Sequence, residues 1–285
     1  MKAAAKFQAH GDGSLSREML DSYVRNGFLV LADFWSAETC QRVMERAEHL
    51  AETVDRPEQS AAFSTTSRVQ DSDSYFKDSG GRIAVFFEEG MGDQDGRAVN
   101  KLGHAMHDLD PVFEQVSRDP RLAQVCHDLA IADPGLVQSM VIFKRPHVGG
   151  EVTAHQDSTF LHTTPTSVVG LWFALEDATV QNGCLYAVPG AHEQGLKQRY
   201  HYSGEALVMD DLRDGEESWE LSQAVPLEAS AGSLVILHGL LPHFSGANTS
   251  AKSRMAYTLH VIDQKAKWSD DNWLRRAEDM PVRGF

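Results

Sequence analysis

The sequence changes character near Gly135, and this change limits the possible folds more than any other feature of the chain. After this point short apolar runs follow one another, separated by Gly, Pro or Asn. Runs of this kind are typical of β-strands joined by turns. The predicted strands of this half are 136–143, 168–175, 184–188, 233–237 and 255–262.

The first half of the chain is predicted to be mainly helical. A helix over 16–26 should end at Gly27, because glycine readily adopts the left-handed conformation found at helix ends. A short buried strand should follow at 28–31, and a second helix should open at Ser36, where apolar residues recur at helical spacing. Further predicted elements are a strand at 83–87 and short helices at 102–106, 111–116 and 121–129.

Helices followed by many short strands predict a mixed, mainly β fold. The best candidate is a double-stranded β-helix, the jelly-roll or cupin-like core, buttressed by N-terminal helices. One large domain can absorb 285 residues when long loops cover a cavity, so we expect a single domain over 1–285. Its helical part should span about 14–131 and its β-helix core about 136–263. The polar segments 53–81 and 190–225 are expected to be surface loops that cover the binding site.

The composition narrows the partners of this protein. A formal net charge of -15 repels phosphate backbones and anionic membranes, so neither nucleic acid nor a membrane surface is an expected partner. With no apolar window long enough to span a bilayer and no signal-peptide core, the chain is predicted to be soluble and cytoplasmic. Three widely spaced cysteines, Cys40, Cys126 and Cys184, suit neither a disulfide framework nor a zinc ribbon and are predicted to be free thiols.

A candidate metal site begins at His155 and Asp157, which lie two residues apart. In an extended strand, residues two apart project from the same face, so both side chains can reach one ion while Gln156 points elsewhere. A third ligand must come from a distant segment, and 237–245 offers both His238 and His243. Two histidines and one carboxylate form the facial triad of non-haem Fe(II) oxygenases, whereas zinc is more often four-coordinate.

Arg254 lies eleven residues after His243. Its guanidinium is a permanently charged, two-pronged donor for a carboxylate such as the tail of 2-oxoglutarate. The alternative is a surface arginine that forms a salt bridge at the start of a strand. Only the nearby triad favours the cosubstrate role.

Several stretches of the chain resemble the phytanoyl-CoA dioxygenase family, and in particular its domain-containing proteins. The run Gly149 to Asp157 contains the His-x-Asp pair, and His238 to Ser245 contains the distant histidine. The resemblance extends over nearly the whole chain. The other stretches that carry it are 100–104, 138–144, 172–189, 253–260 and 272–274.

The resemblance implies a double-stranded β-helix that uses Fe(II), 2-oxoglutarate and dioxygen. It further implies hydroxylation of an aliphatic carbon of a small organic or lipid-like substrate, with release of succinate and carbon dioxide. By position it assigns iron to His155, Asp157 and His243. Besides these three, the 2-oxoglutarate contacts that it assigns are Lys101, Met140, Gln156, Trp172, Ser245 and Arg254. Judged from the residues alone, Met140 and Trp172 suit a core as well as a pocket wall, and Lys101 suits a solvated helix.

Other functions compete with hydroxylation. The same oxidation can end in desaturation, ring closure or endoperoxide formation, whereas a halogenase is disfavoured because Asp157 fills the position that a halide would need. A non-catalytic jelly-roll module that binds a metal is a further alternative. A zinc hydrolase lacks an obvious fourth ligand. A coenzyme A thioester would need several basic residues for its phosphates, and this acidic chain offers only scattered ones such as Lys144, Arg145, Lys197 and Arg199.

Overall fold

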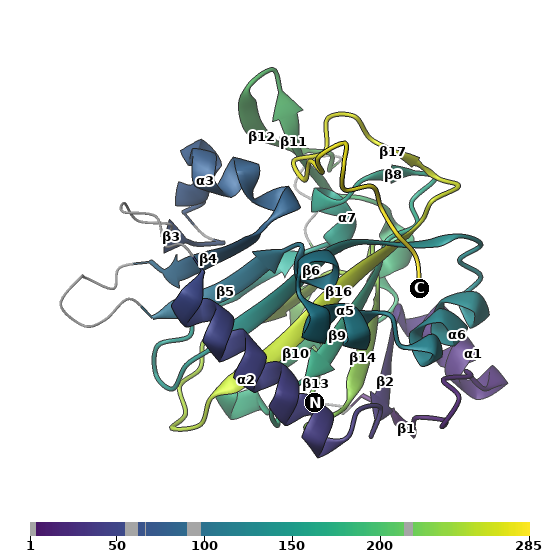
Figure 1. Ribbon diagram of the computed structural model, residues 1–285. Helices are drawn as coiled ribbons and strands as arrows, with labels where there is room; N and C mark the ends of the chain where they lie inside the picture. The colour runs from purple at the N-terminus through teal and green to yellow at the C-terminus, as the bar shows by residue number, and fades with distance from the viewer. Residues whose placement is uncertain (1–3, 55–61, 66, 90–97, 214–218) are drawn as a thin grey trace.

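The computed structural model describes residues 4–54, 62–65, 67–89, 98–213 and 219–285 (Figure 1). Two β-sheets form the centre of this part of the chain. The larger sheet contains nine strands, and in spatial order they are β1 (Lys6–Gln8), β2 (Phe28–Ala32), β14 (Leu234–His238), β9 (Val169–Ala174), β16 (Arg254–Asp263), β6 (Pro134–Lys144), β5 (Val99–His104), β4 (Ile83–Glu88) and β3 (Ala62–Phe63). The smaller sheet contains four, which are β13 (Val225–Leu227), β10 (Leu185–Ala187), β15 (His243–Ser245) and β7 (Val152–His155).

Both sheets contribute walls to one cavity. The predicted mainly β fold with a double-stranded β-helix core is therefore confirmed, and each of the five strands predicted after Gly135 is present as β6, β9, β10, β14 or β16. In the first half of the chain, the strands predicted at 28–31 and 83–87 are present as β2 and β4, and together with β5 they extend the larger sheet.

The prediction of a helix over 102–106 is wrong. Residues 102–104 of this range belong to β5, which pairs with β4 on one side and with β6 on the other. Hydrogen bonding to two neighbouring strands overrides the weak local preference for helix. A one-turn helix, α4 (Met106–Leu109), begins only after the strand has ended. Lys101 consequently lies on a buried strand and not on a solvated helix.

The helices α1, α2, α5 and α6 begin close to where the sequence indicates. α1 (Arg17–Asn26) is capped by Ser16 and stops at Gly27, whose φ of 77° is left-handed, and α2 (Ala37–Thr53) is capped by Ser36. α5 (Pro111–Ser117) and α6 (Pro120–Asp128) start at prolines after aspartate caps. Figure 1 shows α2 and α5 in front of the larger sheet. The aromatic core between this layer and the sheet includes Trp35, whose ring stacks on Phe173 at 3.9 Å.

The polar segments predicted as covers contain structure of their own. The segment 190–225 forms a hairpin of β11 (Gln198–Ser203) and β12 (Ala206–Asp211), and 53–81 includes α3 (Ser74–Lys77). Residues 55–61, 66 and 214–218 of these covers lie outside the described residues. The remaining elements are α7 (Asp157–Phe160), β8 (Thr163–Thr164), β17 (Lys267–Trp268) and the 3-10 turns Val69–Ser72, Asp78–Gly81, Val180–Asn182, Ala191–Gln194 and Leu221–Gln223.

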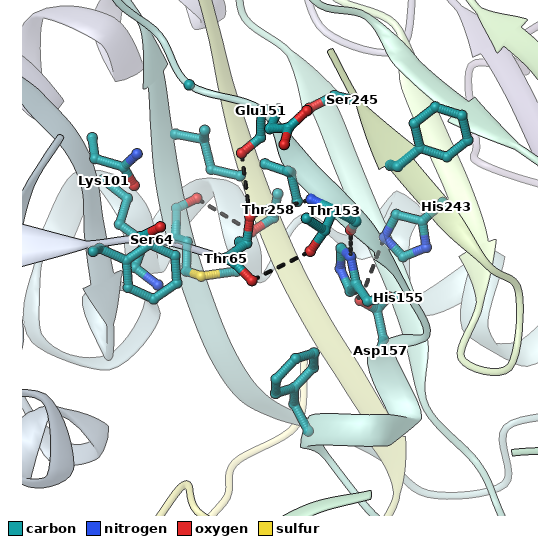
Figure 2. Close-up of a pocket in the computed structure, with 18 of the residues that line it drawn as sticks. Ser64, Thr65, Lys101, Glu151, Thr153, His155, Asp157, His243, Ser245 and Thr258 are labelled. Carbon is teal, nitrogen blue, oxygen red and sulfur yellow. Dashed lines mark hydrogen bonds and ion pairs between the residues drawn. The ribbon is translucent and has the colours of Figure 1, made fainter. Parts of the chain in front are cut away.

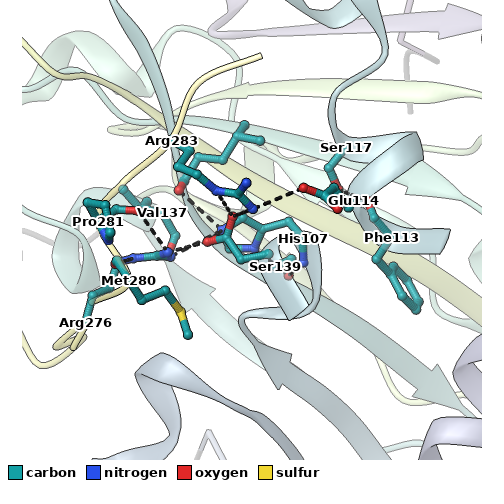
Figure 3. A network of polar contacts seen from close by, with 12 residues as sticks. His107, Phe113, Glu114, Ser117, Val137, Ser139, Arg276, Met280, Pro281 and Arg283 are labelled. Carbon is teal, nitrogen blue, oxygen red and sulfur yellow. Dashed lines mark hydrogen bonds and ion pairs between the residues drawn. The ribbon is translucent and has the colours of Figure 1, made fainter. Parts of the chain in front are cut away.

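Arg276 and Arg283 of the C-terminal segment both pair with Asp108 of α4. Figure 3 shows these two arginines beside His107, the residue before Asp108. The carboxylate of Asp108 is 3% exposed and accepts hydrogen bonds from Arg118 at 2.7 Å, from Arg283 at 2.8 Å and from Arg276. No helix within the described ranges combines the length and apolar character needed to cross a bilayer. Cys40, Cys126 and Cys184 are buried free thiols, as predicted.

Candidate active site

His155 is the last residue of β7, and Asp157 is the first residue of α7. The sequence predicts that both lie in one strand, but the strand ends at His155. Gln156 between them still has extended backbone angles, with φ at -110° and ψ at 138°. The His155 and Asp157 side chains therefore project to the same side, as the two-residue spacing requires.

His243 comes from β15, the neighbour of β7, and stands directly opposite His155 in the antiparallel pair. Its Nε2 lies 3.6 Å from Asp157 Oδ1, and the Nε2 of His155 lies 3.8 Å from the same oxygen (Figure 2). One ligand atom from each residue lies within 4.8 Å of the other two. Within the described ranges this is the one such cluster of His, Cys, Asp or Glu side chains.

Both histidines are oriented by their backbone. His155 Nδ1 lies 2.8 Å from the carbonyl oxygen of Thr153, and His243 Nδ1 lies 3.0 Å from that of Leu241. A carbonyl can only accept, so each Nδ1 carries the proton and each Nε2 presents a lone pair toward Asp157. Burial, followed by repulsion from His243, lowers the pKa of His155 to about 4, so this imidazole is neutral at pH 7.

His238, the other histidine of the same segment, lies outside this cluster. Its Nδ1 accepts a hydrogen bond from the Leu240 amide at 3.1 Å, and its ring lies against His192 and Tyr23. Burial lowers its pKa to about 4. It does not line the cavity that contains Asp157.

His260 is a neighbour of the cluster that sequence reasoning missed. Its Nε2 lies 3.4 Å from Asp157 Oδ1. Burial alone would raise the pKa of Asp157, but interactions with the imidazole rings, His260 first and then His243, hold it below its usual range. The available signal was parity along β16, because His260 and Arg254 are an even number of residues apart and therefore face the same side of the sheet.

Arg254 opens β16 and is 1% exposed, so the alternative of a surface salt bridge is wrong. Its Nε donates to the Gly183 carbonyl at 3.1 Å, while Nη1 is buried without a hydrogen-bond partner among the described residues. Burial lowers its pKa to about 10, which still leaves it cationic at neutral pH. A buried cation with an unsatisfied donor suits an anionic ligand that completes the pair.

The other residues assigned by the resemblance mostly surround the same cavity of about 680 Å³. Trp172 and Met140 flank Thr258 in register across the larger sheet, and Ser245 lies on β15. The Lys101 ammonium lies 3.2 Å from the centre of the Phe63 ring, and burial holds its pKa well below the usual value.

Gln156 is the exception. Its side-chain amide donates to the carbonyls of Gly195 at 2.8 Å and Leu240 at 2.7 Å, and its oxygen accepts from the Lys197 amide at 2.9 Å. These hydrogen bonds connect the loop that contains Gly195 and Lys197 to the loop that contains Leu240. The side chain does not line the cavity.

A double-stranded β-helix with two histidines and one aspartate grouped beside a buried arginine defines the class of 2-oxoglutarate-dependent non-haem iron oxygenases. Within this class, the model of the family "Phytanoyl-CoA dioxygenase (PhyH)" matches residues 23–256, and the chain belongs to this family.

Relatives agree with this assignment. The chain is 42% identical over 276 residues to "Phytanoyl-CoA dioxygenase 1" of Oryza sativa subsp. japonica, covering 93% of this chain and 95% of that one. It is 39% identical over 282 residues to "Phytanoyl-CoA dioxygenase domain-containing protein 1" of Bos taurus, covering 94% and 97%.

Among solved structures, the carbocyclase SnoK from nogalamycin biosynthesis shares the fold with a TM-score of 0.66, at 20% identity over 92% of this chain and 90% of that one. The epimerase SnoN, solved with Fe3+ and alpha ketoglutarate, has a TM-score of 0.65 at 17% identity, covering 94% and 92%.

Proposed function

We propose that this protein is an Fe(II)- and 2-oxoglutarate-dependent dioxygenase that hydroxylates an aliphatic carbon of a small organic or lipid-like substrate. His155 Nε2, the Asp157 carboxylate and His243 Nε2 would hold the iron, and Arg254 would hold the far carboxylate of 2-oxoglutarate. The observation that carries the proposal is the orientation of the ligands. Two imidazoles direct Nε2 toward one carboxylate, in the cavity that also contains an unsatisfied donor of Arg254.

The residues fit both groups chemically. Two imidazole nitrogens and one carboxylate are the donor set of mononuclear non-haem iron, and their side chains occupy one side of the cavity. When bound, iron, 2-oxoglutarate and dioxygen supply the oxidation, in which the cosubstrate becomes succinate and carbon dioxide and the substrate gains a hydroxyl group. The protein supplies binding, orientation and exclusion of water.

The larger sheet would orient the cosubstrate. Arg254 and Thr258 share one face of β16, and Trp172 lies beside them on β9, so the carboxylate end meets a cation and the chain meets an apolar wall. The Arg254 guanidinium carbon lies 5.6 Å from the centre of the Trp172 ring. Arg254 and Trp172 are both buried, and this limits the access of water to the carboxylate that would pair with Arg254.

The size and lining of the cavity support a small, partly apolar substrate. A cavity of about 680 Å³ is in the usual range for small-molecule sites, and its wall includes Phe160, Leu161, Met209 and Phe244. Residues of the two covers, in the ranges 63–65, 68–71 and 198–209, line it, and the Tyr200 hydroxyl donates to Asp71 at 2.7 Å. We propose that these covers select the substrate.

Three basic residues considered for a coenzyme A thioester have other partners. Arg145 lies 2.6 Å from Glu48, and Arg199 pairs with Asp271. Lys144 donates to the carbonyl oxygens of Gly150 and Gly246. This supports a substrate without nucleotide phosphates.

The direct test is succinate formation by iron-loaded protein supplied with 2-oxoglutarate and candidate substrates. Substrate-dependent succinate together with a product heavier by one oxygen atom supports hydroxylation. A product lighter by two hydrogen atoms would instead assign desaturation or ring closure to the same site. Protein that binds iron but forms no succinate with or without substrate would contradict the proposal.

A further inference from the structure

The Asp157 carboxylate lies over a pair of residues in the larger sheet, although the two candidate histidine ligands belong to the smaller sheet. That pair is Gly170 on β9 and His260 on β16, which face each other in antiparallel register. His260 Nε2 lies 3.4 Å from Asp157 Oδ1. A Cβ on Gly170 would lie 2.6 Å from Asp157 Oδ2, closer than any real Cβ contact allows.

His260 has one productive hydrogen-bonding orientation. Its side chain is 8% exposed, and its Nδ1 is buried without a partner among the described residues. The Asp157 carboxylate is an acceptor within reach of Nε2, so the tautomer with hydrogen on Nε2 gains a charge-assisted bond to Oδ1. His260 does not belong to the cluster of mutually close ligand atoms formed by His155, Asp157 and His243.

Asp157 needs such support because its side chain has few other contacts. Oδ2 is buried and unpartnered within the described ranges, and the ion-pair contacts of Oδ1 there are with the two candidate ligands and His260. Without His260, only the metal and steric contacts would fix rotation of the carboxylate. Partners that orient a ligand typically change metal affinity by about 10- to 100-fold.

We propose that His260 and Gly170 are positioning residues for Asp157, in which His260 Nε2–H donates to Oδ1 and Gly170 leaves the space that Oδ2 occupies. This inference rests on the proposed metal site. The larger sheet thereby contributes Arg254 for the cosubstrate and His260 for the metal ligand from the same face of β16.

The test compares anaerobic binding of Co(II) to metal-free wild-type, His260→Gln and His260→Leu proteins, followed through the visible d–d bands of the bound metal. Glutamine keeps an N–H donor at a reach close to that of Nε2, and leucine removes it. We expect His260→Leu to bind Co(II) about 10- to 100-fold more weakly and His260→Gln to stay within a few-fold of the wild type. His238→Leu, which changes a largely buried histidine outside the cavity, is the matched control and should bind like the wild type.

Unchanged affinity and bands in His260→Leu would overturn the role of His260, and so would equal weakening in His260→Gln and His260→Leu. Thermal unfolding of the metal-free proteins separates loss of the fold from loss of the contact. A wild-type protein that binds no Co(II) would contradict the proposed function itself.

Gly170 is tested by its coupling to Asp157. Gly170→Ala should lower the unfolding temperature of the metal-free protein, and the same change should have a much smaller effect when Asp157→Ala has removed the clashing oxygen. Equal effects in both backgrounds would overturn the role of Gly170, since the other close neighbour of that Cβ, Leu237 at 3.5 Å, is present in both.

Discussion

His155 and His243 face each other across the antiparallel pair of β7 and β15, and each donates Nδ1–H to the carbonyl oxygen two residues before it. This repeated hydrogen bond fixes the tautomer of both rings before any metal arrives. The backbone therefore holds both imidazole rings in the orientation that a metal ligand needs.

Replacement of Arg254 should raise the 2-oxoglutarate requirement far more than it disturbs iron binding. A buried charge pair that loses one side typically costs about 2 to 5 kcal/mol, or roughly thirty- to several-thousand-fold in affinity. We expect that range for Arg254→Ala and only partial recovery in Arg254→Lys, because an ammonium lacks the two-pronged geometry. The measurement is succinate formation titrated with 2-oxoglutarate at saturating Fe(II), with iron content as the control. An unchanged requirement in a folded Arg254→Ala protein would refute this role.

Replacement of the two histidines of the segment 237–245 should have opposite effects on the amount of bound iron. His243→Ala should lose bound iron, because His243 Nε2 faces Asp157, whereas His238→Ala should retain it, because His238 packs against His192 and Tyr23. Elemental analysis of protein prepared without air measures both. Retention in the first variant with loss in the second would reverse the assignment.

Acid should destabilise the metal-free protein partly through His155. Its pKa is about 4 when folded against an ordinary value of 6.5, so between these values the unfolded chain binds a proton that the folded protein does not. The contribution of His155 to the free energy of unfolding is fully present above about pH 6.5. It decreases toward pH 4, by up to about 3 kcal/mol. His155→Gln, which cannot titrate, should lose less stability over this range in urea unfolding. His107 and His238 also have lowered pKa values, but they are present in both the wild type and His155→Gln and contribute equally to both. An identical pH dependence of stability in the two proteins would therefore contradict the lowered pKa of His155.

Asp108 should be a stability residue with no role in metal binding. Asp108→Asn would leave Arg118, Arg276 and Arg283 around a neutral amide, and loss of one partner from a buried ionic group typically costs about 3 to 5 kcal/mol. Part of that cost should be recovered, because the amide oxygen still accepts hydrogen bonds. Chemical unfolding should show the loss, and Co(II) affinity should stay unchanged at temperatures where the variant is folded. A wild-type unfolding midpoint would disprove the structural role.

Local patterns were sufficient to predict much of the fold. The strands at 168–175 and 255–262 carry their own apolar pattern and turn signals, and they appear as β9 and β16. The two-residue spacing of His155 and Asp157 also places both side chains on one side through an extended Gln156, even though the strand itself ends early.

The missed features depend on contacts between distant segments. Residues 99–104 form a strand because β4 and β6 pair with them on either side, and no local pattern records those partners. His260 approaches Asp157 only because β16 lies beside β9 in a register that sets His260 opposite Gly170. Spacing along β16 places His260 on the same face as Arg254, but it does not show that Asp157 lies beside that face.

The most direct test of the account is the visible difference spectrum of metal-free protein on anaerobic addition of Fe(II) and then 2-oxoglutarate. Chelation of the cosubstrate needs a triad that leaves adjacent positions of the iron open. We predict a weak charge-transfer band in the wild type that requires both additions and is absent or strongly reduced in Asp157→Ala. A wild-type protein without this band, or an Asp157→Ala protein with the wild-type band and full iron content, would contradict the assignment of His155, Asp157 and His243 as the iron site.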